Sequence, residues 1–369
     1  MPSLFARIDR TIEFMFPTTL PTMVALVLVG LVACQPTPQA TAPSSNTGQS
    51  EAATAQMPGE GVKVRPSTFA KPERRFFAEV INIGLETLGY DVKEIQQLSP
   101  SIAHPAVGNG DLDFYIPHLE KSHAQFFEKG GGEQKLERVG VLIPNLLEGY
   151  SIDRKTAEEY KITDLEQLKD PELAKLFDSD GDGKANLAGC EVGQACERII
   201  DYHLQAYGLQ NTVEHDKGSA SILFADVLAR HQQGKHVLYY TSIPSWFDYQ
   251  LQIGKDVVWL PVPFTALPEA QKNFTAQDTS AEGKNLGFPV NRMQVLANQT
   301  FIEANPAAKC WIEQVQIPVE DLVAEFQRIA EGESSPREIR RHAREWIESN
   351  QQQVDNWLEE AKNPANICS

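Results

Sequence analysis

The sequence predicts an α/β protein folded into two lobes. Apolar segments with the alternation or continuity typical of strands take turns with segments of helical period throughout the body of the chain, which begins near residue 61. The body is long enough for two lobes. A first set of strands and helices is followed by a second set, and the last part of the chain then adds further elements to the first set. We therefore expect residues 61–148 and 262–369 to form lobe 1 and residues 149–261 to form lobe 2.

Residues 1–33 have the composition of an export signal. Arg7 and Arg10 precede the apolar run Met23–Ala33, which is shorter than the ~20 apolar residues of a membrane-spanning helix. A basic start, an apolar centre and small residues before a cleavage site are typical of a secretory signal peptide. We therefore expect the chain to be exported to a periplasmic or cell-surface location.

The segment "LVAC", Leu31–Cys34, resembles the lipoprotein box of bacteria. This resemblance implies that Cys34 is lipidated, becomes the new N-terminus and anchors the protein to a membrane. The alternative is an ordinary signal peptide with an incidental cysteine. Residues 34–60 are rich in Pro, Ser, Thr, Gln and Ala and hold almost no large apolar side chains, so we expect them to form a disordered tether.

Two cysteines in the stretch "GCEVGQAC", Cys190 and Cys196, are expected to form a disulfide, because export places them in an oxidising compartment. A metal site would need further Cys or His ligands at short spacing, and a redox pair would favour C-x-x-C; neither pattern lies nearby. Cys310 and Cys368 are the candidates for a second bridge, although sequence alone does not fix their connectivity.

Composition and motifs narrow the class of function. The formal net charge of −17 argues against a nucleic-acid partner, and no segment after the signal is apolar enough to span a membrane. The sequence contains no nucleophile elbow, glycine-rich phosphate loop or zinc-protease motif. We therefore expect a monomeric binding protein for a small molecule, with neither catalytic residues nor an organic cofactor.

In lobe 1 we expect strands joined by helices. Pro72 begins a helix whose apolar residues recur at helical period, and Gly89 ends it. A second, short helix ends at Gly110. The expected strands are residues 62–68, 90–95 and 112–116. Strands separated by helices predict a parallel sheet with crossover connections.

The second set of elements begins near Gly149. Thr163 and Glu166 form a capping box, and Asp170 with Pro171 starts a short helix that runs through Phe177. The remaining expected elements are helices 196–209 and 221–234, strands 236–242 and 256–264, the segment 287–298 and helices from Val319 onward. We expect strand 256–264 to carry the chain back to lobe 1. A sheet unit interrupted by a second one is typical of a two-lobed binding protein.

Several stretches in this order are similar to the periplasmic glycine betaine/proline betaine-binding proteins of ProU-type ABC importers, the ProX-like family with an OpuAC-type substrate-binding domain. They are "LGYDVKEI", the long segment 149–190, "YYTSIPSW", "GKDVVWLPVPF" and "NPAAKCWIEQVQIPVEDL". The resemblance implies a type II bilobal binding protein with its ligand cleft between the lobes. It also implies that the protein delivers a compatible solute to a membrane permease and its ATPase subunit.

In the family, one half of the site holds the ligand carboxylate. The resemblance places the donors of this half at the His123 side chain and at the backbone N–H groups of Ala195 and Cys196. The start of a helix presents unpaired N–H groups and a partial positive charge to an anion, and a disulfide would hold this loop rigid. The alternative for His123 is an ordinary histidine on a surface helix.

The other half of the family site is a box of three tryptophans that holds a quaternary ammonium by cation–π attraction. The three positions read Leu119, Gln194 and Ser242 in this chain, so all three aromatic walls are missing. Residues near them in sequence are the candidates to rebuild a cage, and the alternative is that most of them belong to the core. These residues are Trp246, Tyr240, Tyr239, Tyr115 and Phe247.

The replacements also permit a different ligand. Gln194 and Ser242 supply hydrogen-bond donors and acceptors, and Glu120 is expected to face an ammonium that carries N–H groups. A polar amino acid or a related zwitterion is therefore the alternative to a betaine. A further alternative is a ligand-sensing lipoprotein that signals to a membrane kinase.

The acidic stretch "DSDGDGKAN" has the first half of an EF-hand calcium loop. Asp178, Asp180 and Asp182 stand at alternate positions and Gly183 follows. The twelfth position, where a bidentate Glu is expected, is Gly189. A structural calcium ion held with the help of Asn186 or backbone oxygens is one interpretation, and a turn rich in Asp and Gly without an ion is the other.

Overall fold

A computed structural model describes residues 57–364 and Cys368. The expected signal peptide, the lipidation candidate Cys34 and most of the expected tether lie outside these residues. Met57 to Glu60, which we expected in the tether, form a turn on the folded body, where the Gly59 N–H donates to Leu88 O at 2.9 Å. A Cβ at Gly59 would lie 2.4 Å from the Tyr90 ring, so the body already begins at this turn.

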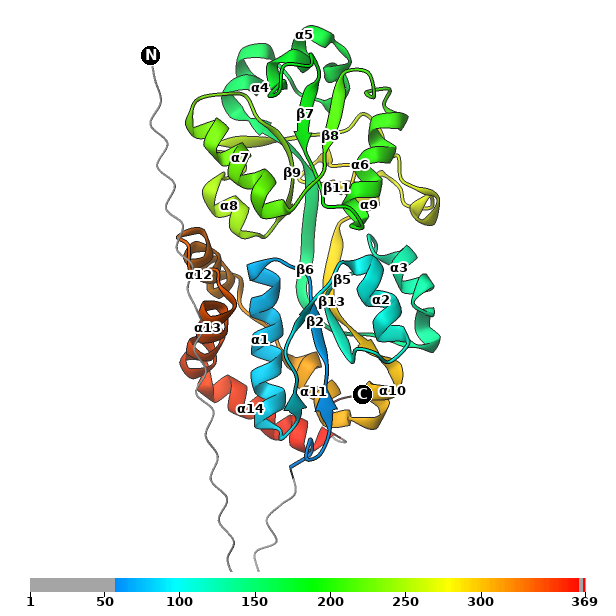
Figure 1. Cartoon of the computed structure of the whole chain (residues 1–369), viewed down its shortest axis with the longest axis vertical. Coiled ribbons are helices and arrows are strands. Elements are labelled where there is room, and N and C mark those ends of the chain that lie inside the picture. The colour runs from blue at the N-terminus through cyan, green and yellow to red at the C-terminus, as the bar shows by residue number, and fades with distance from the viewer. Residues whose placement is uncertain (1–56, 365–367, 369) are drawn as a thin grey trace, which may run out of the picture. The chain divides into compact units, whose positions relative to one another are not determined.

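The described chain forms two α/β lobes joined by a long strand (Figure 1). Strand β6, Leu136–Asp153, pairs with β13, Asn291–Asn298, along its first part. Its second part pairs with β9, Leu238–Ile243, and with β10, Val257–Leu260. The sheet order β4-β2-β5-β13-β6-β9-β7-β8 therefore passes from one lobe into the other through β6.

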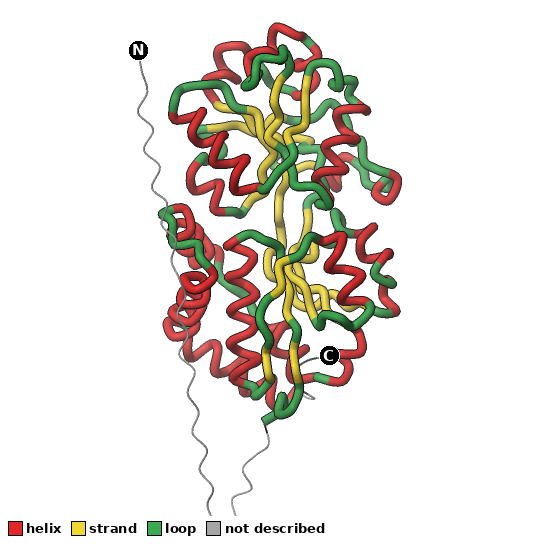
Figure 2. The backbone as a smooth tube through the Cα atoms, viewed as in Figure 1, coloured by secondary structure: helices red, strands yellow, loops and turns green. Residues whose placement is uncertain are grey.

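Lobe 1 begins with a helix packed on a short sheet. Its elements up to β6 are β1 Lys63–Val64, β2 Pro66–Thr68, α1 Pro72–Thr87, β3 Asp91–Val92, β4 Gln96–Gln97, α2 Pro100–Gly108, β5 Phe114–Leu119 and α3 Ala124–Lys129. After β13 the chain adds α10 Gln299–Ala304, α11 Pro306–Gln314, α12 Val319–Ala330, α13 Pro336–Ser349 and α14 Gln351–Lys362. The strands run through the middle of the lobe with helices on both sides (Figure 2).

The centre of lobe 1 is the contact between α1 and α11. Trp311 is fully buried, and its Nε1 donates to Ile81 O at 2.9 Å. Gly84 lies beneath the indole, where an added Cβ would come within 2.0 Å of the ring. The Cys310–Cys368 disulfide, which the sequence suggested, joins α11 to the end of the chain.

Lobe 2 lies between the two parts of lobe 1 in the sequence. Its helices are α4 Arg154–Tyr160, α5 Pro171–Ala174, α6 Ala195–Ala206, α7 Ala220–Gln232, α8 Trp246–Gln250 and α9 Ala276–Thr279. Its further strands are β7 Ala185–Ala188, β8 Val213–Asp216, β11 Ser280–Ala281 and β12 Lys284–Asn285. Short 3₁₀ turns, including Leu165–Lys169 and Lys175–Phe177, complete it.

The sheet is mixed, whereas the alternation of strands and helices predicted a parallel one. The helix-connected pairs β2–β5 and β7–β8 are parallel as expected. In contrast, β13 is antiparallel to both β5 and β6, and β9 and β10 are antiparallel to β6. The reason is that β6 runs from lobe 1 into lobe 2 and β13 runs back, so the two strands that connect the lobes lie side by side in opposite directions.

The chain returns to lobe 1 later than we expected. Strand β10 pairs with β6 inside lobe 2, with Val257 opposite Asp153. Val262, Leu267 and Phe288 then pack in the core of lobe 2, and only β13 pairs with β5 of lobe 1. The packing therefore differs from the boundary expected at residue 262, because the apolar strand that we interpreted as the crossing completes the second sheet.

Helix starts were predicted closely but not everywhere. Pro72 and Val319 begin α1 and α12 as expected, and Asp170 caps the short helix that starts at Pro171. The predicted capping box at Thr163 and Glu166 is wrong by one residue, because it is formed by Asp164 and Gln167. The Asp164 carboxylate accepts the Glu166 N–H at 2.7 Å, and the Gln167 amide oxygen accepts the Asp164 N–H at 3.1 Å.

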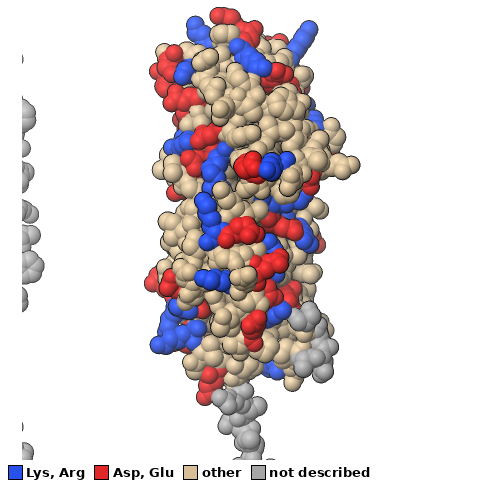
Figure 3. All heavy atoms as spheres, turned by 90° about the vertical axis from the view of Figure 1, so that its right-hand side faces the viewer, with Lys and Arg blue, Asp and Glu red and all other residues tan. Residues whose placement is uncertain are grey.

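Acidic and basic side chains are interspersed over the face drawn in Figure 3, across both lobes. The negative net charge is thus not gathered into one block on this face. None of the helices within residues 57–364 is both long enough and apolar enough to cross a membrane.

Candidate functional site

A cleft between the lobes brings together most of the residues expected at the site. From lobe 1 it is lined by Phe69, Lys71, Arg74, Tyr115, Pro117, Leu119, His123 and Leu146, and from β6 by Glu148. From lobe 2 it is lined by residues 188–191, Gln194, Ala195, Cys196, Ala220, Leu223, Phe224, Val227, residues 239–242 and Phe247. Its empty volume is about 840 Å³ with the open mouth included.

The cleft lies beyond the carboxyl ends of strands, where ligands bind in open α/β sheets. Leu119 is the last residue of β5 and Ala188 the last of β7. The cysteine loop that follows β7 leads directly into α6, and its Cys190–Cys196 disulfide is formed as expected. Gly193 in this loop has a φ of +91°, and an added Cβ would meet Ser101 Oγ of α2 at 2.9 Å. The loop therefore approaches lobe 1 closely.

The start of α6 supplies backbone donors to the cleft. Ala195 is the first residue of the helix, Gln194 is its N-cap, and no side chain caps it. The first N–H groups of a helix lack intrahelical acceptors and carry the positive end of the helix dipole. Ala195 and Cys196 both line the cleft. This end of α6 therefore suits a carboxylate.

His123 presents a second donor, and its tautomer follows from one contact. Its side chain is buried, and Nδ1 accepts the backbone N–H of Leu119 at 3.1 Å. A neutral imidazole that accepts at Nδ1 carries its proton at Nε2. Burial lowers the pKa of His123 well below its usual value, and the neighbouring His104 and His118 lower it further. His123 is therefore a neutral ring whose Nε2–H can donate to an anion.

Two buried histidines beside His123 complete a cluster with the geometry of a metal site. His104 Nδ1 is 2.8 Å from Pro100 O, which can only accept, so His104 Nε2 accepts from His118 Nδ1 at 3.0 Å. His118 Nε2 in turn accepts from Arg138 Nε at 3.3 Å. Every ring nitrogen of His104 and His118 thus has a partner. The cluster supports the wall of the cleft and leaves no set of lone pairs for a metal ion.

The three positions of the expected tryptophan box all line the cleft. Leu119, Gln194 and Ser242 lie there without an aromatic ring, and Gln194 Nε2 is buried without a hydrogen-bond partner. Tyr240, Tyr239, Tyr115 and Phe247 line it as well. Contact of any of these side chains with a ligand stays a prediction.

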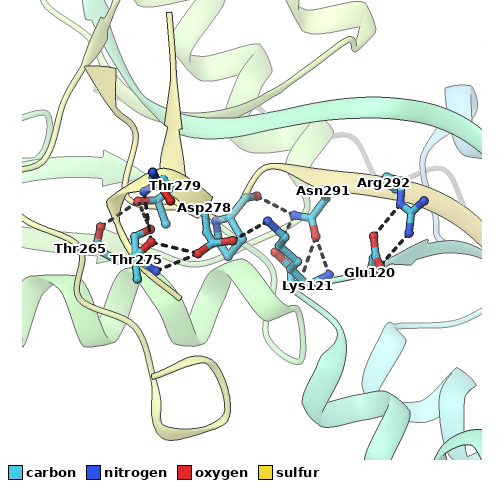
Figure 4. A network of polar contacts seen from close by, with 11 residues as sticks. Glu120, Lys121, Thr265, Thr275, Asp278, Thr279, Asn291 and Arg292 are labelled. Carbon is cyan, nitrogen blue, oxygen red and sulfur yellow. Dashed lines mark hydrogen bonds and ion pairs between the residues drawn. The ribbon is translucent and has the colours of Figure 1, made fainter. Parts of the chain in front are cut away.

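Two residues that we expected at the site lie elsewhere. Trp246 is not among the lining residues and packs on Phe224 and Phe247, with ring centroids 5.4 and 4.4 Å away. Glu120 accepts Nε and Nη2 of Arg292 at 2.7 and 2.9 Å, outside the lining (Figure 4). The half-buried Trp246 indole packs against the core because α8 turns it toward α7. The Glu120 carboxylate is neutralised by Arg292 of β13.

Sequence reasoning missed four charged residues of the cleft, of which Glu191 belongs to the cysteine loop. Lys71 and Arg74 come from the start of α1, and Glu148 comes from the part of β6 that joins the lobes. The stretch "KPERR" has the charge pattern of an ordinary exposed first turn, so it carried no signal. Glu148 did carry a signal in the sequence, because a carboxylate in the apolar run before Gly149 is unusual for a strand buried on both faces.

A polar network attaches the segment after β5 to lobe 2 (Figure 4). Lys121 Nζ pairs with Asp278 Oδ1 at 2.9 Å, and Lys121 O accepts Gln271 Nε2 at 3.1 Å. Asn291 Oδ1 accepts the backbone N–H groups of Lys121 and Ser122, each at 2.9 Å. These contacts fix the segment that carries His123.

The aspartate side chains of the acidic loop make their hydrogen bonds within the loop. Asp178 accepts backbone N–H groups of residues 180, 181 and 183, and these bonds, with the Gly181 N–H first, hold its pKa below the usual value. Asn186 Oδ1 accepts the Ser179 N–H at 2.7 Å. The three carboxylates of Asp178, Asp180 and Asp182 lie close together. A calcium ion here stays a prediction.

The two-lobed fold and its cleft define a solute-binding protein, and comparisons give its family. Residues 62–349 match the family described as the substrate-binding domain of ABC-type glycine betaine transport systems. The chain is 42% identical to the glycine betaine-binding periplasmic protein OusX of Dickeya dadantii and 41% identical to the glycine betaine/proline betaine-binding periplasmic protein of Escherichia coli K12. Each comparison spans 83% of this chain and 92% of the relative.

Solved structures share the fold. The glycine betaine/L-proline-binding protein of Borrelia burgdorferi has a TM-score of 0.64 at 16% identity, over 82% of this chain and 98% of that one. Lactococcal OpuAC, closed on glycine betaine, has a TM-score of 0.60 at 16% identity, over 80% of this chain and 99% of that one. The chain belongs to the family of substrate-binding domains of ABC-type glycine betaine transport systems, which bind solutes and are not enzymes.

Proposed function

We propose that this chain is the exported solute-binding subunit of an ABC importer and that it captures a small, compatible-solute-like zwitterion by its carboxylate. The observation that carries the proposal is the pairing, in one cleft, of a neutral histidine donor at His123 with the uncapped start of α6. Both favour an anion, and they come from different lobes. A ligand held by both would therefore favour the closed arrangement of the lobes.

The partners follow from the family. The relatives named above are periplasmic binding proteins for glycine betaine or proline betaine, which supports export and a ligand of similar size. We propose a membrane permease with its ATPase subunit as the partners that receive the ligand. We also propose that Cys34 is lipidated and holds the protein at a membrane, with residues 35–56 as its tether.

Calorimetric titration of the purified chain tests the proposal. The ligands are glycine betaine, proline betaine and a panel of free amino acids. Each is titrated into the wild type, into His123→Gln and into the control variant His231→Gln. His231 lies on α7, outside the cleft lining. We expect one zwitterion to bind with one-to-one stoichiometry and no product, at least tenfold more weakly in His123→Gln. Equal affinity in folded His123→Gln would contradict the carboxylate socket, and turnover of a ligand would contradict the class.

A further inference from the structure

Arg74 is a buried cation without an anionic partner. Its exposed fraction is 4%, and it lines the cleft. Among the described residues its guanidinium makes one hydrogen bond, from Nη1 to Met293 Sδ at 3.1 Å, and no carboxylate lies within ion-pair distance. A guanidinium has five N–H donors, and a thioether sulfur is a weak acceptor. Most of the hydrogen-bonding capacity of Arg74 is therefore unused in the protein itself.

Glu148 is the opposite case, a buried carboxylate that feels the charges of Lys71 and Arg74 but forms no ion pair with either among the described residues. Its exposed fraction is also 4%. Oε2 accepts from Ser122 Oγ at 3.1 Å and from Asn291 Nδ2 at 2.8 Å, and Oε1 accepts from the Tyr240 hydroxyl. All three donors are neutral groups. Since each carboxylate oxygen has two acceptor positions, one position on Oε1 remains open.

The two side chains line the same cleft but do not pair with each other. Lys71, the other cation of the lining, has the carboxylates of Glu73, Glu148 and Asp248 near it. Its ammonium lies 5.2 Å from the centre of the Phe247 ring, and no ion pair joins it to a carboxylate among the described residues. A buried charge without a partner is unfavourable. A ligand that carries both signs of charge satisfies Arg74 and Glu148 together, whereas a ligand of one sign leaves the other residue unpaired.

The open position on Glu148 distinguishes between kinds of ammonium. A quaternary ammonium has no N–H to donate and is held best by aromatic faces. Leu119, Gln194 and Ser242, the three positions of the expected box, offer no such faces, and the aromatic rings of the lining stand at other positions. A primary or secondary ammonium can donate to Glu148 Oε1, and a charge-assisted bond of this kind is about twice as strong as a neutral one.

We propose, on the basis of the function proposed above, that the ligand is a zwitterion whose ammonium carries N–H groups, such as a free or singly N-methylated amino acid. Glu148 accepts a hydrogen bond from the ammonium, and Arg74 donates to an acidic oxygen of the same ligand. Both are specificity-determining residues of the cleft.

An N-methylation series tests this inference. The ligands are glycine, sarcosine, N,N-dimethylglycine and glycine betaine, with proline and proline betaine as a second pair, titrated calorimetrically into the purified chain. We expect affinity to fall with methylation, and the betaine of each series to bind at least tenfold more weakly than its best-bound N–H form. Tightest binding of the betaines overturns the inference. If that binding is lost in His123→Gln, the proposed function stands; if no member of either series binds to the folded chain, both fail.

Two variants separate recognition from structure. Glu148→Gln keeps the shape of the side chain, and we expect it to lower the affinity for the N–H form at least tenfold and to bring the preference over the betaine close to one. Arg74→Gln should weaken all members by similar factors and keep the preference. Glu120→Gln and Arg292→Gln, an ion pair outside the lining, are the controls. An unchanged preference in folded Glu148→Gln overturns the role of Glu148, and unchanged affinities in Arg74→Gln overturn that of Arg74.

Discussion

The backbone N–H of Leu119 donates to Nδ1 of His123 at 3.1 Å, and this bond leaves Nε2 as the donor of the ring. The contact joins the last residue of β5 to the turn before α3. It makes the histidine a donor at Nε2 without a positive charge, because burial keeps the pKa of His123 low. The proposed carboxylate socket thus combines two neutral sources of N–H groups, the imidazole and the start of α6.

The first prediction concerns the cysteine loop. Replacing Cys190 and Cys196 by serine should lower ligand affinity, because the loop that presents the α6 N–H groups is no longer fixed. Removing Cys310 and Cys368 should leave affinity unchanged and reduce stability more. Chain entropy assigns about 2 kcal/mol to the bridge with a separation of 6 residues and about 4 kcal/mol to the one with a separation of 58.

Urea unfolding and calorimetric titration of both double variants, under identical oxidising conditions, measure the two effects separately. Wild-type affinity in the variant without the Cys190–Cys196 disulfide would contradict the proposed role of the cysteine loop in ligand binding.

The second prediction concerns Asp248, whose burial raises its pKa to about 8. The unfolded value is about 3.9, so between these values the folded chain holds a proton that the unfolded chain has released. Stability in the wild type is therefore lost as pH rises through this window, by up to about 1.4 kcal/mol per pH unit. Asp248→Asn removes this dependence and can still accept the Ser245 N–H.

Urea unfolding of wild type and Asp248→Asn at pH 5 and pH 7.5 tests this linkage. The advantage of the variant should be larger at pH 7.5. The exposed Asp226→Asn serves as the control, and an advantage that does not grow with pH contradicts a raised pKa at Asp248.

The third prediction sets helix propensity against packing at Gly84. Alanine in place of glycine inside a helix is favourable by about 1 kcal/mol. At Gly84 the new Cβ would lie 2.0 Å from the buried Trp311 ring, and overpacking of this kind costs typically 1–3 kcal/mol or more. Because the contact is so short, we expect the cost to exceed the gain and Gly84→Ala to be destabilising by up to about 2 kcal/mol in urea unfolding. A more stable variant would show that α1 and α11 can separate at little cost.

The fourth prediction concerns the ion pair that joins the lobes. Lys121 and Asp278 are both partly exposed, and pairs of this kind contribute about 0.2–1 kcal/mol. Lys121→Met should therefore raise the dissociation constant of the ligand by a factor of roughly 1.4–5, less in high salt. Lys272→Met, whose partner Glu269 lies three residues away in the same turn, is the control. No change at low salt would mean that the pair does not contribute to closure.

The fold could be predicted from the sequence where a local signal existed. Apolar periodicity and Pro72 or Val319 at helix starts located α1 and α12, and the strand–helix alternation gave two α/β lobes. The crossing point was misplaced because only long-range pairing distinguishes β10, which stays in lobe 2, from β13, which returns to lobe 1.

The site could be predicted only where the sequence near a residue carried a signal. The resemblance located His123 and the start of α6, and both line the cleft. Arg74 lies at the start of a helix, where a charged residue is ordinary, and its lack of an ion-pair partner among the described residues is a tertiary property. Trp246 looked like a cage residue by its place after a strand, but the direction of α8 puts the indole against Phe224.

The central claim is that the cleft keeps a socket for a carboxylate and lacks a cage for a quaternary ammonium. Calorimetric titration with glycine betaine, of wild type and of a variant with tryptophan at positions 119, 194 and 242, tests it most directly. Three cation–π contacts of ~0.5–2 kcal/mol each predict that the folded variant binds at least roughly tenfold more tightly than the wild type. Micromolar binding of betaine by the wild type, with no gain in the variant, would contradict the claim.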